Sequence, residues 1–357
     1  MGRAVKRPTW TPHITAQVRT AAVAAVVFVV TAALLLFVPV PYVMYSPGNA
    51  YDIFAKDEHG RPTVAVDGVT TYPISGELRM TTVSVTRSDA RLTLPEVLFG
   101  HVAPSRDVLP RSSVYPDEDK SPEQVRTEEQ QMMDTSQQEA IVAAVRAADM
   151  PIEERPVIAG VITGGPADGI LVPGDFIMAV DGERVRATSD VPDRVQTHRP
   201  GDDVTLSVIG ESDENPQDVT VPVEEGPDGA PRIGVTVSTG YRYEPDVTFG
   251  VKESIGGPSA GLIFALGIYD QLTPGDLVAG RDIAGTGTID VDGNVGPIGG
   301  IREKIHGAQD AGAQMFLVPG ENCPDVRGMA TDIDLVRVDT LDGAIDALSG
   351  DAALPRC

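Results

Sequence analysis

Several residue types that mark other classes of protein are scarce in this 357-residue chain. It has two cysteines, which excludes a disulfide-dense scaffold and a four-cysteine zinc site. Its 28 Lys and Arg residues face 52 Asp and Glu residues, a formal net charge of −24, so it lacks the density of cations that neutralises nucleic-acid phosphates. It contains no Gly-Lys-Ser/Thr sequence, and therefore no P-loop for a nucleotide. We expect no nucleic acid, metal or cofactor as a partner.

One long apolar run lies near the N-terminus, from Ala21 to Val38, and it carries no charge. A helix needs about 20 apolar residues to cross the hydrocarbon core, and the stretch up to Val43 extends the run, so we predict a transmembrane helix over residues 20–43. Four cations and no acid precede it, which places the tail 1–19 in the cytoplasm and the rest outside. The alternative is a cleaved signal peptide. We favour a retained anchor because the run exceeds a signal's apolar region of about 7–15 residues and no small-residue cleavage site follows.

The two cysteines, Cys323 and Cys357, lie outside the membrane in this topology, where thiols can oxidise. They are either two inert thiols or a disulfide that ties the C-terminal tail 351–357 to the preceding domain, and we favour the disulfide. Closing a loop of this size contributes about 3–4 kcal/mol in the chain-entropy model.

The rest of the chain has a globular composition, with 41% hydrophobic and 22% charged residues. At about 150 residues per domain, its length allows two domains with accessory segments. Residue patterns predict strands over 63–69, 76–86 and 315–318, and a helix over 128–148. The charged, proline-containing stretch 104–129 predicts a loop or linker.

Residues 156–223 read as a compact unit of strands and short turns around one helix at 190–198. Between residues 164 and 182, Gly-x-Pro-Ala, Leu-x-x-Gly-Asp-x-Ile and Val-Asp-Gly follow in order, a pattern that resembles bacterial PDZ domains. Such domains bind extended peptides by adding a strand to a sheet edge. The resemblance implies a groove between the strand near 157–161 and the helix, and core packing is the alternative for its apolar residues. The expected groove residues are Val157, Val161, Val191, Val195 and His198.

A glycine-rich bend, Ser-Ile-Gly-Gly-Pro-Ser-Ala-Gly, precedes an apolar helix predicted over 262–272. We expect Ser259 at the first turn of this helix, where free backbone N–H groups and the helix dipole favour developing negative charge. A serine there can be a nucleophile beside an oxyanion hole, which the backbone of Gly257, Ser259 and Ala260 would form. The alternative for Ser259 is a helix N-cap.

A serine nucleophile needs a base, and none of the five histidines has an obvious orienting carboxylate. Lys304, one of only five lysines, lies at the start of another predicted helix. A lysine acts as a base when burial lowers its pKa, and Ser-Lys pairs are an accepted variant of the catalytic triad. The alternative for Lys304 is an ordinary solvated lysine.

The run 257–304 resembles the proteolytic domain of Lon-type peptidases. Gly-Pro-Ser-Ala-Gly, Arg-Asp-Ile-Ala-x-Thr-Gly, Gly-x-Val-x-Pro-Ile-Gly-Gly and Glu-Lys occur in the family's order. The resemblance implies that Ser259 is the nucleophile, that Lys304 is the general base, and that Thr286 helps to hold the lysine. One position departs from the pattern, because Gly256 stands where many Lon peptidases carry an acid.

The whole chain resembles the membrane-anchored PDZ–Lon peptidases of Gram-positive bacteria. This implies an α/β (α+β) Lon-type proteolytic domain and a small β-rich PDZ domain after one N-terminal transmembrane helix. We also hypothesise that strands within 51–86 complete the Lon-like domain, so that the PDZ domain is an insertion. The expected segments are the tail 1–19, the anchor 20–43, a β-rich segment 44–130, the PDZ domain with its preceding helix 131–228, the Lon-type domain 229–350 and the tail 351–357.

The function we expect is an ATP-independent serine endopeptidase of the cell membrane, with its PDZ and catalytic domains outside the cytoplasm. Its partners would be unstructured or PDZ-delivered polypeptides, and six copies could form a ring by analogy with Lon domains. One alternative is a membrane-anchored PDZ scaffold whose Lon-like domain is inactive. Another is a signal-peptidase-like Ser-Lys enzyme that cleaves near the bilayer.

Overall fold

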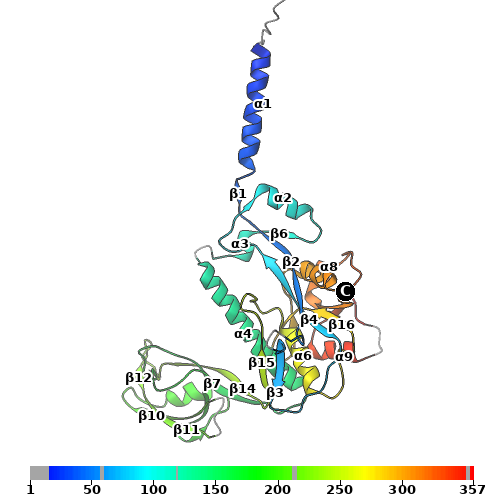
Figure 1. Ribbon diagram of the computed structural model, residues 1–357. Helices are drawn as coiled ribbons and strands as arrows, with labels where there is room; N and C mark the ends of the chain where they lie inside the picture. Colours follow the sequence, from blue (N-terminus) through cyan, green and yellow to red (C-terminus); the bar gives the residue numbers. More distant parts are fainter. Residues whose placement is uncertain (1–15, 57–59, 118–119, 211–214, 351–353) are drawn as a thin grey trace, which may run out of the picture.

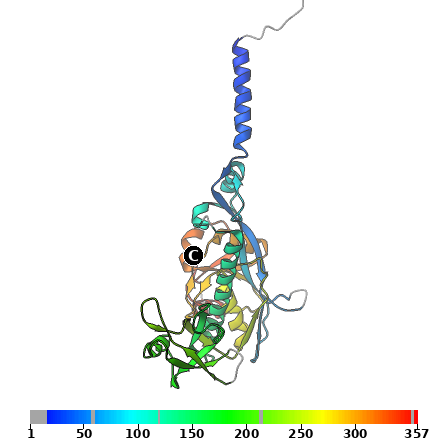
Figure 2. The same cartoon turned by 90° about the vertical axis from the view of Figure 1, so that its left-hand side faces the viewer.

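An N-terminal helix, a large unit and a small unit make up the molecule (Figure 1). The small unit comprises residues 153–242, and the large unit is built from the segments on either side of it, 39–152 and 243–357. Both views place the small unit at the end of the molecule farthest from the N-terminal helix (Figures 1 and 2). The computed structural model describes residues 16–56, 60–117, 120–210, 215–350 and 354–357.

Helix α1 (Ala16–Leu35) is long and apolar enough to cross a membrane, and none of its residues is buried. It ends earlier than the predicted span 20–43, so that prediction was wrong at its C-terminal end. Pro39 disfavours helical geometry at the residue before it, and strand β2 (Tyr42–Asp52) already begins at Tyr42. Most of the predicted cytoplasmic tail lies outside the described residues.

The large unit is organised around a mixed six-stranded sheet in the order β20-β19-β16-β4-β2-β6. The first four strands are parallel, and β2 and β6 run antiparallel to their neighbours. Strand β4 pairs with β16, with Leu78 opposite Ile283, so residues far apart in sequence share one sheet. The strands are β2 (Tyr42–Asp52), β4 (Glu77–Val85), β6 (Asp107–Pro110), β16 (Asp282–Gly285), β19 (Met315–Pro319) and β20 (Asp334–Val338).

Side-chain alternation along β19 divides the large unit into two cores. Met315 and Leu317 join the core beneath α4, α6 and α9, whereas Phe316 and Val318 join the core beneath α7 and α8. The strand is buried on both faces, as expected for parallel strands covered by helices. The helices are α4 (Pro122–Ala147), α6 (Gly261–Leu272), α7 (Ile301–Asp310), α8 (Cys323–Val326) and α9 (Leu341–Ser349).

Helix α4, which the sequence grouped with the PDZ domain, packs instead on the large unit. Its buried residues Met133, Ala140 and Ala144 belong to the same core as Leu262 and Leu266 of α6. The 3.6-residue periodicity identified the apolar face of this helix, but periodicity does not say which core that face covers.

The small unit has a sheet of its own, in the order β11-β10-β8-β7-β14, with a separate core. Strand β14 was predicted to lie in the Lon-type domain 229–350. The structure places it in the small unit instead, because it pairs with β7 along its whole length, from Val235 opposite Val161 to Arg242 opposite Glu153. The elements are β7 (Glu153–Val161), β8 (Phe176–Val180), β9 (Glu183–Arg184), α5 (Asp190–Val195), β10 (Asp203–Ile209), β11 (Gln217–Pro222) and β14 (Val235–Arg242).

Shorter elements complete the fold. Strand β15 pairs with β3 beside α6, and β17 pairs with β18 in a small hairpin. Their bounds and those of the remaining elements are β1 (Pro39–Val40), β3 (Val64–Asp67), β5 (Leu92–Thr93), α2 (Leu94–Val102), α3 (Arg111–Val114), β12 (Glu224–Glu225), β13 (Pro231–Arg232), β15 (Asp246–Phe249), β17 (Thr288–Ile289), β18 (Val295–Gly296) and a 3₁₀ turn (Gly320–Asn322).

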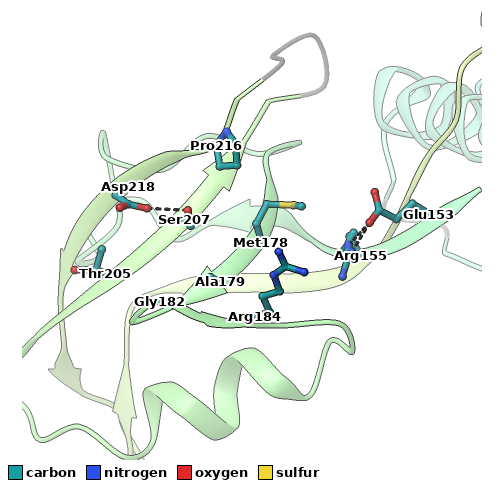
Figure 3. A pocket seen from close by; sticks show the side chains of 10 residues that line it. All are labelled: Glu153, Arg155, Met178, Ala179, Gly182, Arg184, Thr205, Ser207, Pro216 and Asp218. Carbon is teal, nitrogen blue, oxygen red and sulfur yellow. Dashed lines mark hydrogen bonds and ion pairs between the residues drawn. The ribbon is translucent and has the colours of Figure 1, made fainter.

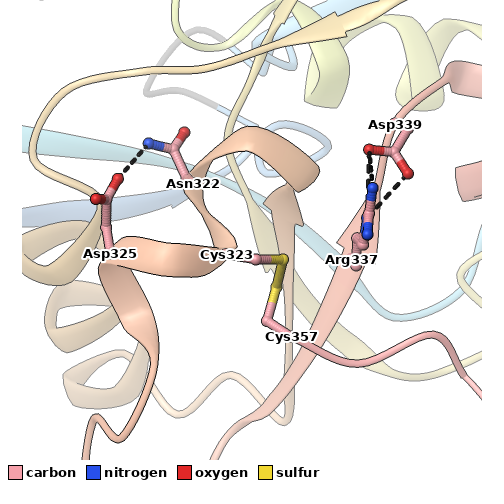
Figure 4. The surroundings of a disulfide bond; sticks show 6 residues. All are labelled: Asn322, Cys323, Asp325, Arg337, Asp339 and Cys357. Atoms are coloured by element: carbon pink, nitrogen blue, oxygen red, sulfur yellow. Dashed lines mark hydrogen bonds and ion pairs between the residues drawn. A yellow bond between two sulfur atoms is a disulfide. The ribbon is translucent and has the colours of Figure 1, made fainter.

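The C-terminal tail is joined to the large unit by the disulfide between Cys323, at the start of α8, and Cys357 (Figure 4). Beside it, the carbonyl of Pro355 accepts the N–H of Arg337 in β20, and Arg356 pairs with Asp334. The tail therefore runs along β20 and is attached to it by polar contacts as well as by the covalent bond.

Candidate active site

Ser259 lies in the bend before α6 and is partly exposed. The sequence placed it in the first turn of the helix, but the helix starts at Gly261 and its N-cap is Ala260, which has no side-chain capping bond. Ser259 is therefore not the N-cap of this helix, and the alternative role suggested by the sequence is wrong. Its Oγ instead accepts a hydrogen bond from Lys304 Nζ at 2.7 Å.

Two parts of the fold hold the backbone of this bend. On one side, the Gly257 N–H donates to the carbonyl of Glu129 at 2.8 Å, and Ser136 Oγ donates to the carbonyl of Pro258 at 2.9 Å. Both acceptor and donor belong to α4, so this helix positions the serine bend directly. Gly257 has φ +87°, a left-handed conformation that favours glycine.

On the other side, the Ser259 carbonyl accepts two hydrogen bonds from the segment after β16. The Gly287 N–H donates at 2.9 Å and Thr286 Oγ1 donates at 2.8 Å. The peptide that follows the serine is therefore fixed in orientation. Sequence reasoning missed Ser136; its signal was a hydroxyl on the apolar face of α4, between Met133 and Ala140.

Lys304 is 2% exposed because it occupies the apolar stripe of α7. Ile301, Lys304, Ile305 and Ala308 follow the spacing i, i+3, i+4, i+7, and all four are buried. Its Nζ also donates to Thr286 Oγ1 at 2.8 Å. Burial penalises the ammonium form and lowers the pKa of Lys304 to about 7, so a large fraction of this amine is neutral near neutral pH.

Glu303, beside Lys304 on α7, is 1% exposed, and sequence reasoning did not identify it. Its Oε2 has no hydrogen-bond partner among the residues that the structure describes. Burial raises the pKa of Glu303 to about 7, and the negative charge of Asp107 adds to the shift. We assign it no part in the chemistry.

Of the three backbone N–H groups predicted to stabilise an oxyanion, one is already used in a hydrogen bond within the protein. The Gly257 N–H is already bonded to Glu129, so the prediction for Gly257 is wrong. Within the described part of the chain, the N–H groups of Ser259 and Ala260 donate to no acceptor. They lie at the N-terminal end of α6, where the helix dipole favours negative charge.

The residues predicted for the PDZ groove are not brought together as an open groove. Strand β7, with Val157 and Val161, is flanked by β14 on one side and β8 on the other. Val191 and Val195 are buried in the core of the small unit. Strand β14 lies at the end of the sheet, so its outer edge has no strand partner within the described chain.

The remaining predicted groove residue, His198, does have a carboxylate partner, contrary to the sequence-based expectation. Its Nε2 lies 3.1 Å from Asp181 Oδ2. Both residues belong to the small unit, in the turns that follow α5 and β8. This histidine is therefore part of the PDZ-like fold and not of the Ser259 site.

Two hollows lie away from the Ser259–Lys304 pair itself. One, of about 550 Å³, lies on the small unit over β8 and β10, bordered by Met178, Thr205 and Ser207 (Figure 3). The other, of about 520 Å³, lies between Tyr51 and the segment 250–255 that leads to the serine bend. Among the described residues, no group of three or more His, Cys, Asp or Glu side chains is placed to hold a metal.

Two protein families match this chain over separate segments. Residues 252–348 match the Lon protease (S16) C-terminal proteolytic domain, and this segment includes Ser259, Thr286 and Lys304. Residues 128–223 match the PDZ domain. A crystal structure of the PDZ domain of an SdrC-like protein from Listeria monocytogenes is 23% identical and covers 23% of this chain and 86% of that chain, with a TM-score of 0.22.

Curated relatives match the proteolytic segment. A Lon protease from Roseiflexus castenholzii is 41% identical over 90 residues, covering 24% of this chain and 11% of that protein. Lon protease 2 from Bacillus subtilis is 31% identical over 106 residues, covering 30% of this chain and 19% of that protein. The chain thus aligns with a small part of these relatives' length. The chain therefore contains a Lon-type proteolytic domain and a PDZ domain, behind an N-terminal apolar helix.

Proposed function

We propose that this chain is an ATP-independent serine endopeptidase in which Ser259 is the nucleophile and Lys304 the general base. The observation that carries the proposal is the contact of 2.7 Å between Ser259 Oγ and the Nζ of a buried lysine whose pKa is about 7. A general base works best when its pKa lies near the working pH. The absence of a P-loop motif from the sequence supports ATP independence.

The geometry supports a two-step acyl transfer. The neutral amine of Lys304 takes the Oγ proton as the oxygen attacks a peptide carbonyl carbon, and the N–H groups of Ser259 and Ala260 stabilise the oxyanion. The C–N bond breaks, the ammonium returns its proton to the leaving amine, and an acyl-enzyme remains. Water then gives a proton to Lys304 and attacks the ester, and the released Ser259 oxygen regains that proton. Thr286 positions Lys304 through its hydroxyl.

The rest of the molecule supports a role in presenting polypeptides. The outer edge of β14 offers backbone groups for an extended peptide, which is how PDZ domains bind. Helix α1 would anchor the chain with the basic tail in the cytoplasm and both units outside. A ring of six chains stays a prediction by analogy, and sedimentation of the solubilised full chain would test it.

The decisive experiment measures hydrolysis of casein by the full chain in detergent, without ATP. We expect the wild type to cleave, Ser259→Ala and Lys304→Met to lose more than about 100-fold in rate, and added ATP to change nothing. Lys120→Met is the matched control, because this surface lysine pairs with Asp117 and Glu128 and should be dispensable. A wild type that hydrolyses neither casein nor a broad peptide library contradicts the proposal and favours a binding scaffold.

A further inference from the structure

Helix α2 presents an apolar face that no other described element covers. Leu98, Phe99 and Val102 are 59%, 62% and 81% exposed. The opposite face is packed closely, because a Cβ at Gly100 would lie 2.7 Å from Val108 and 2.9 Å from Met44. The helix is thus fixed to β2 and β6 on one side while large apolar side chains point away from the protein on the other.

The chain's connections bring this face close to the end of α1. Three residues separate the end of α1 from strand β1, which pairs with β5 and has Pro39 opposite Thr93. Helix α2 starts at Leu94, directly after β5. The four-residue step from Leu35 to Pro39 spans at most about 14 Å, so α2 begins next to the point where α1 would leave the bilayer (Figure 1).

Both ends of helix α2 are defined by local sequence signals. Thr93 and Glu96 form a capping box, in which the Thr93 N–H donates to Glu96 Oε2 at 2.7 Å. The helix ends at Val102, before Ala103 and Pro104. It therefore exists as a preformed element with a fixed orientation relative to the sheet, and it does not need a partner in order to fold.

The charge around α2 differs from that of the rest of the molecule. Residues 86–116 carry four arginines and three acids, a formal charge of +1, whereas residues 117–357 carry 17 Lys and Arg against 44 Asp and Glu, −27. The Arg106 guanidinium lies 5.3 Å from the centre of the Phe99 ring, at the edge of the apolar face. An anionic bilayer surface therefore repels most of the protein but not the end that carries α2.

We propose that α2 lies in the membrane interface, with Leu98, Phe99 and Val102 among the acyl chains and Arg106 at the level of the lipid phosphates. Amphipathic helices bury their apolar face about 5–10 Å into this boundary. Contact with lipid at two places, α1 and α2, would hold the large unit in one orientation over the bilayer instead of letting it swing on the short connection. The proposal rests on α1 being the anchor, as proposed above.

The test uses the full chain in nanodiscs of phosphatidylcholine and phosphatidylglycerol in equal amounts. The natural tryptophan, Trp10, is replaced by Phe, and Phe99→Trp supplies a single reporter. In discs with dibrominated acyl chains we expect the fluorescence to fall by about half, as for a ring in the acyl boundary. The control is Ile162→Trp in the same background, an exposed apolar position on the small unit, which should keep its intensity.

The outcomes separate this proposal from the anchor itself. Flotation with vesicles tests whether α1 anchors the chain. If the chains float but the Phe99→Trp reporter is quenched no more than the Ile162→Trp control, the proposal for α2 is overturned and the anchor is not. A blue-shifted but unquenched reporter means that a protein surface, such as a second copy, covers α2, and this also overturns it. Val102→Trp provides a second reporter in case Phe99→Trp does not fold.

Discussion

At the scale of single residues, burial gives Lys304 the properties of a base. Desolvation lowers its pKa to about 7. The proposed mechanism uses the neutral amine, so kcat/KM should rise with pH and level off above about 7. Initial rates on an unstructured peptide between pH 5.5 and 9 would measure this. A rate that is flat across this range, or that falls from pH 6 to 8, contradicts Lys304 as the base.

Thr286 connects the lysine to the serine backbone, because its hydroxyl accepts from Lys304 Nζ and donates to the Ser259 carbonyl. Thr286→Val removes both bonds at a fully buried position, which costs about 1–3 kcal/mol, or about 5- to 150-fold in kcat. Thr286→Ser keeps the hydroxyl and should restore most of the rate. A positioning role also predicts a shifted pH profile in Thr286→Val; equal loss in both variants with an unchanged profile would instead indicate a packing defect.

Glu303 is the buried acid beside the dyad, and it predicts a pH-dependent stability. Its pKa is about 7 in the folded protein and about 4.5 as an ordinary glutamate. Between these values the folded state keeps a proton that the unfolded state has lost, so this group's contribution to stability falls as pH rises from 4.5 to 7. At pH 8, the free energy of unfolding of Glu303→Gln should therefore exceed that of the wild type by on the order of 3 kcal/mol. Near pH 4.5 the two proteins should unfold at the same denaturant concentration. An equal difference at both pH values would contradict this.

Element by element, the sequence predicted the regular structure well where the pattern is strong. Strands 76–86 and 315–318 and helix 262–272 correspond to β4, β19 and α6 to within one residue at each end. Periodicity follows the face that a segment buries, but it does not say which element that face contacts. This is why the partners of α4 and β14 were missed. The groove was placed beside β7 on the PDZ resemblance, but β7 is an interior strand and β14 is an edge strand of that sheet.

The candidate site was predictable for a different reason. Ser259, Thr286 and Lys304 stand in motifs whose residue types the chemistry requires, and the structure brings all three within hydrogen-bonding distance of one another. The supporting contacts from α4 were not predictable, because they depend on the docking of a helix that is more than 100 residues away in sequence. The same is true of the N–H of Gly257, which α4 occupies.

The docking of α4 also accounts for glycine at position 256. A Cβ at Gly256 would lie 2.7 Å from the Cβ of Glu129, closer than real side chains approach. Gly256→Asp, which introduces an acid here, should push the bend away from α4, destabilise the protein by about 1–3 kcal/mol and lower kcat. Glu129→Gly removes the Cβ that blocks position 256, so the double variant Gly256→Asp/Glu129→Gly should recover stability relative to Gly256→Asp. If the two changes are additive in denaturant unfolding, the collision is not the cause.

At the scale of the whole molecule, the chain's two cysteines link its C-terminal tail to the large unit. The disulfide closes a loop with a sequence separation of 34 residues, which contains β20 and α9. Restricting the unfolded chain in this way contributes about 3–4 kcal/mol, so the variant with both Cys323→Ser and Cys357→Ser should unfold at clearly lower denaturant. Neither sulfur contacts Ser259 or Lys304 in the described structure, so peptide hydrolysis in the absence of denaturant should be retained.

The same bond tests the topology. Outside the cytoplasm thiols oxidise, whereas the cytoplasm keeps them reduced. Protein isolated from its native membrane after rapid alkylation should therefore carry no alkylated cysteine unless it is first reduced. Modification of Cys323 and Cys357 without prior reduction would place the large unit in the cytoplasm and contradict the proposed orientation of α1. If the cysteines are protected but reduction leaves the unfolding midpoint unchanged, only the stabilising role of the disulfide is contradicted.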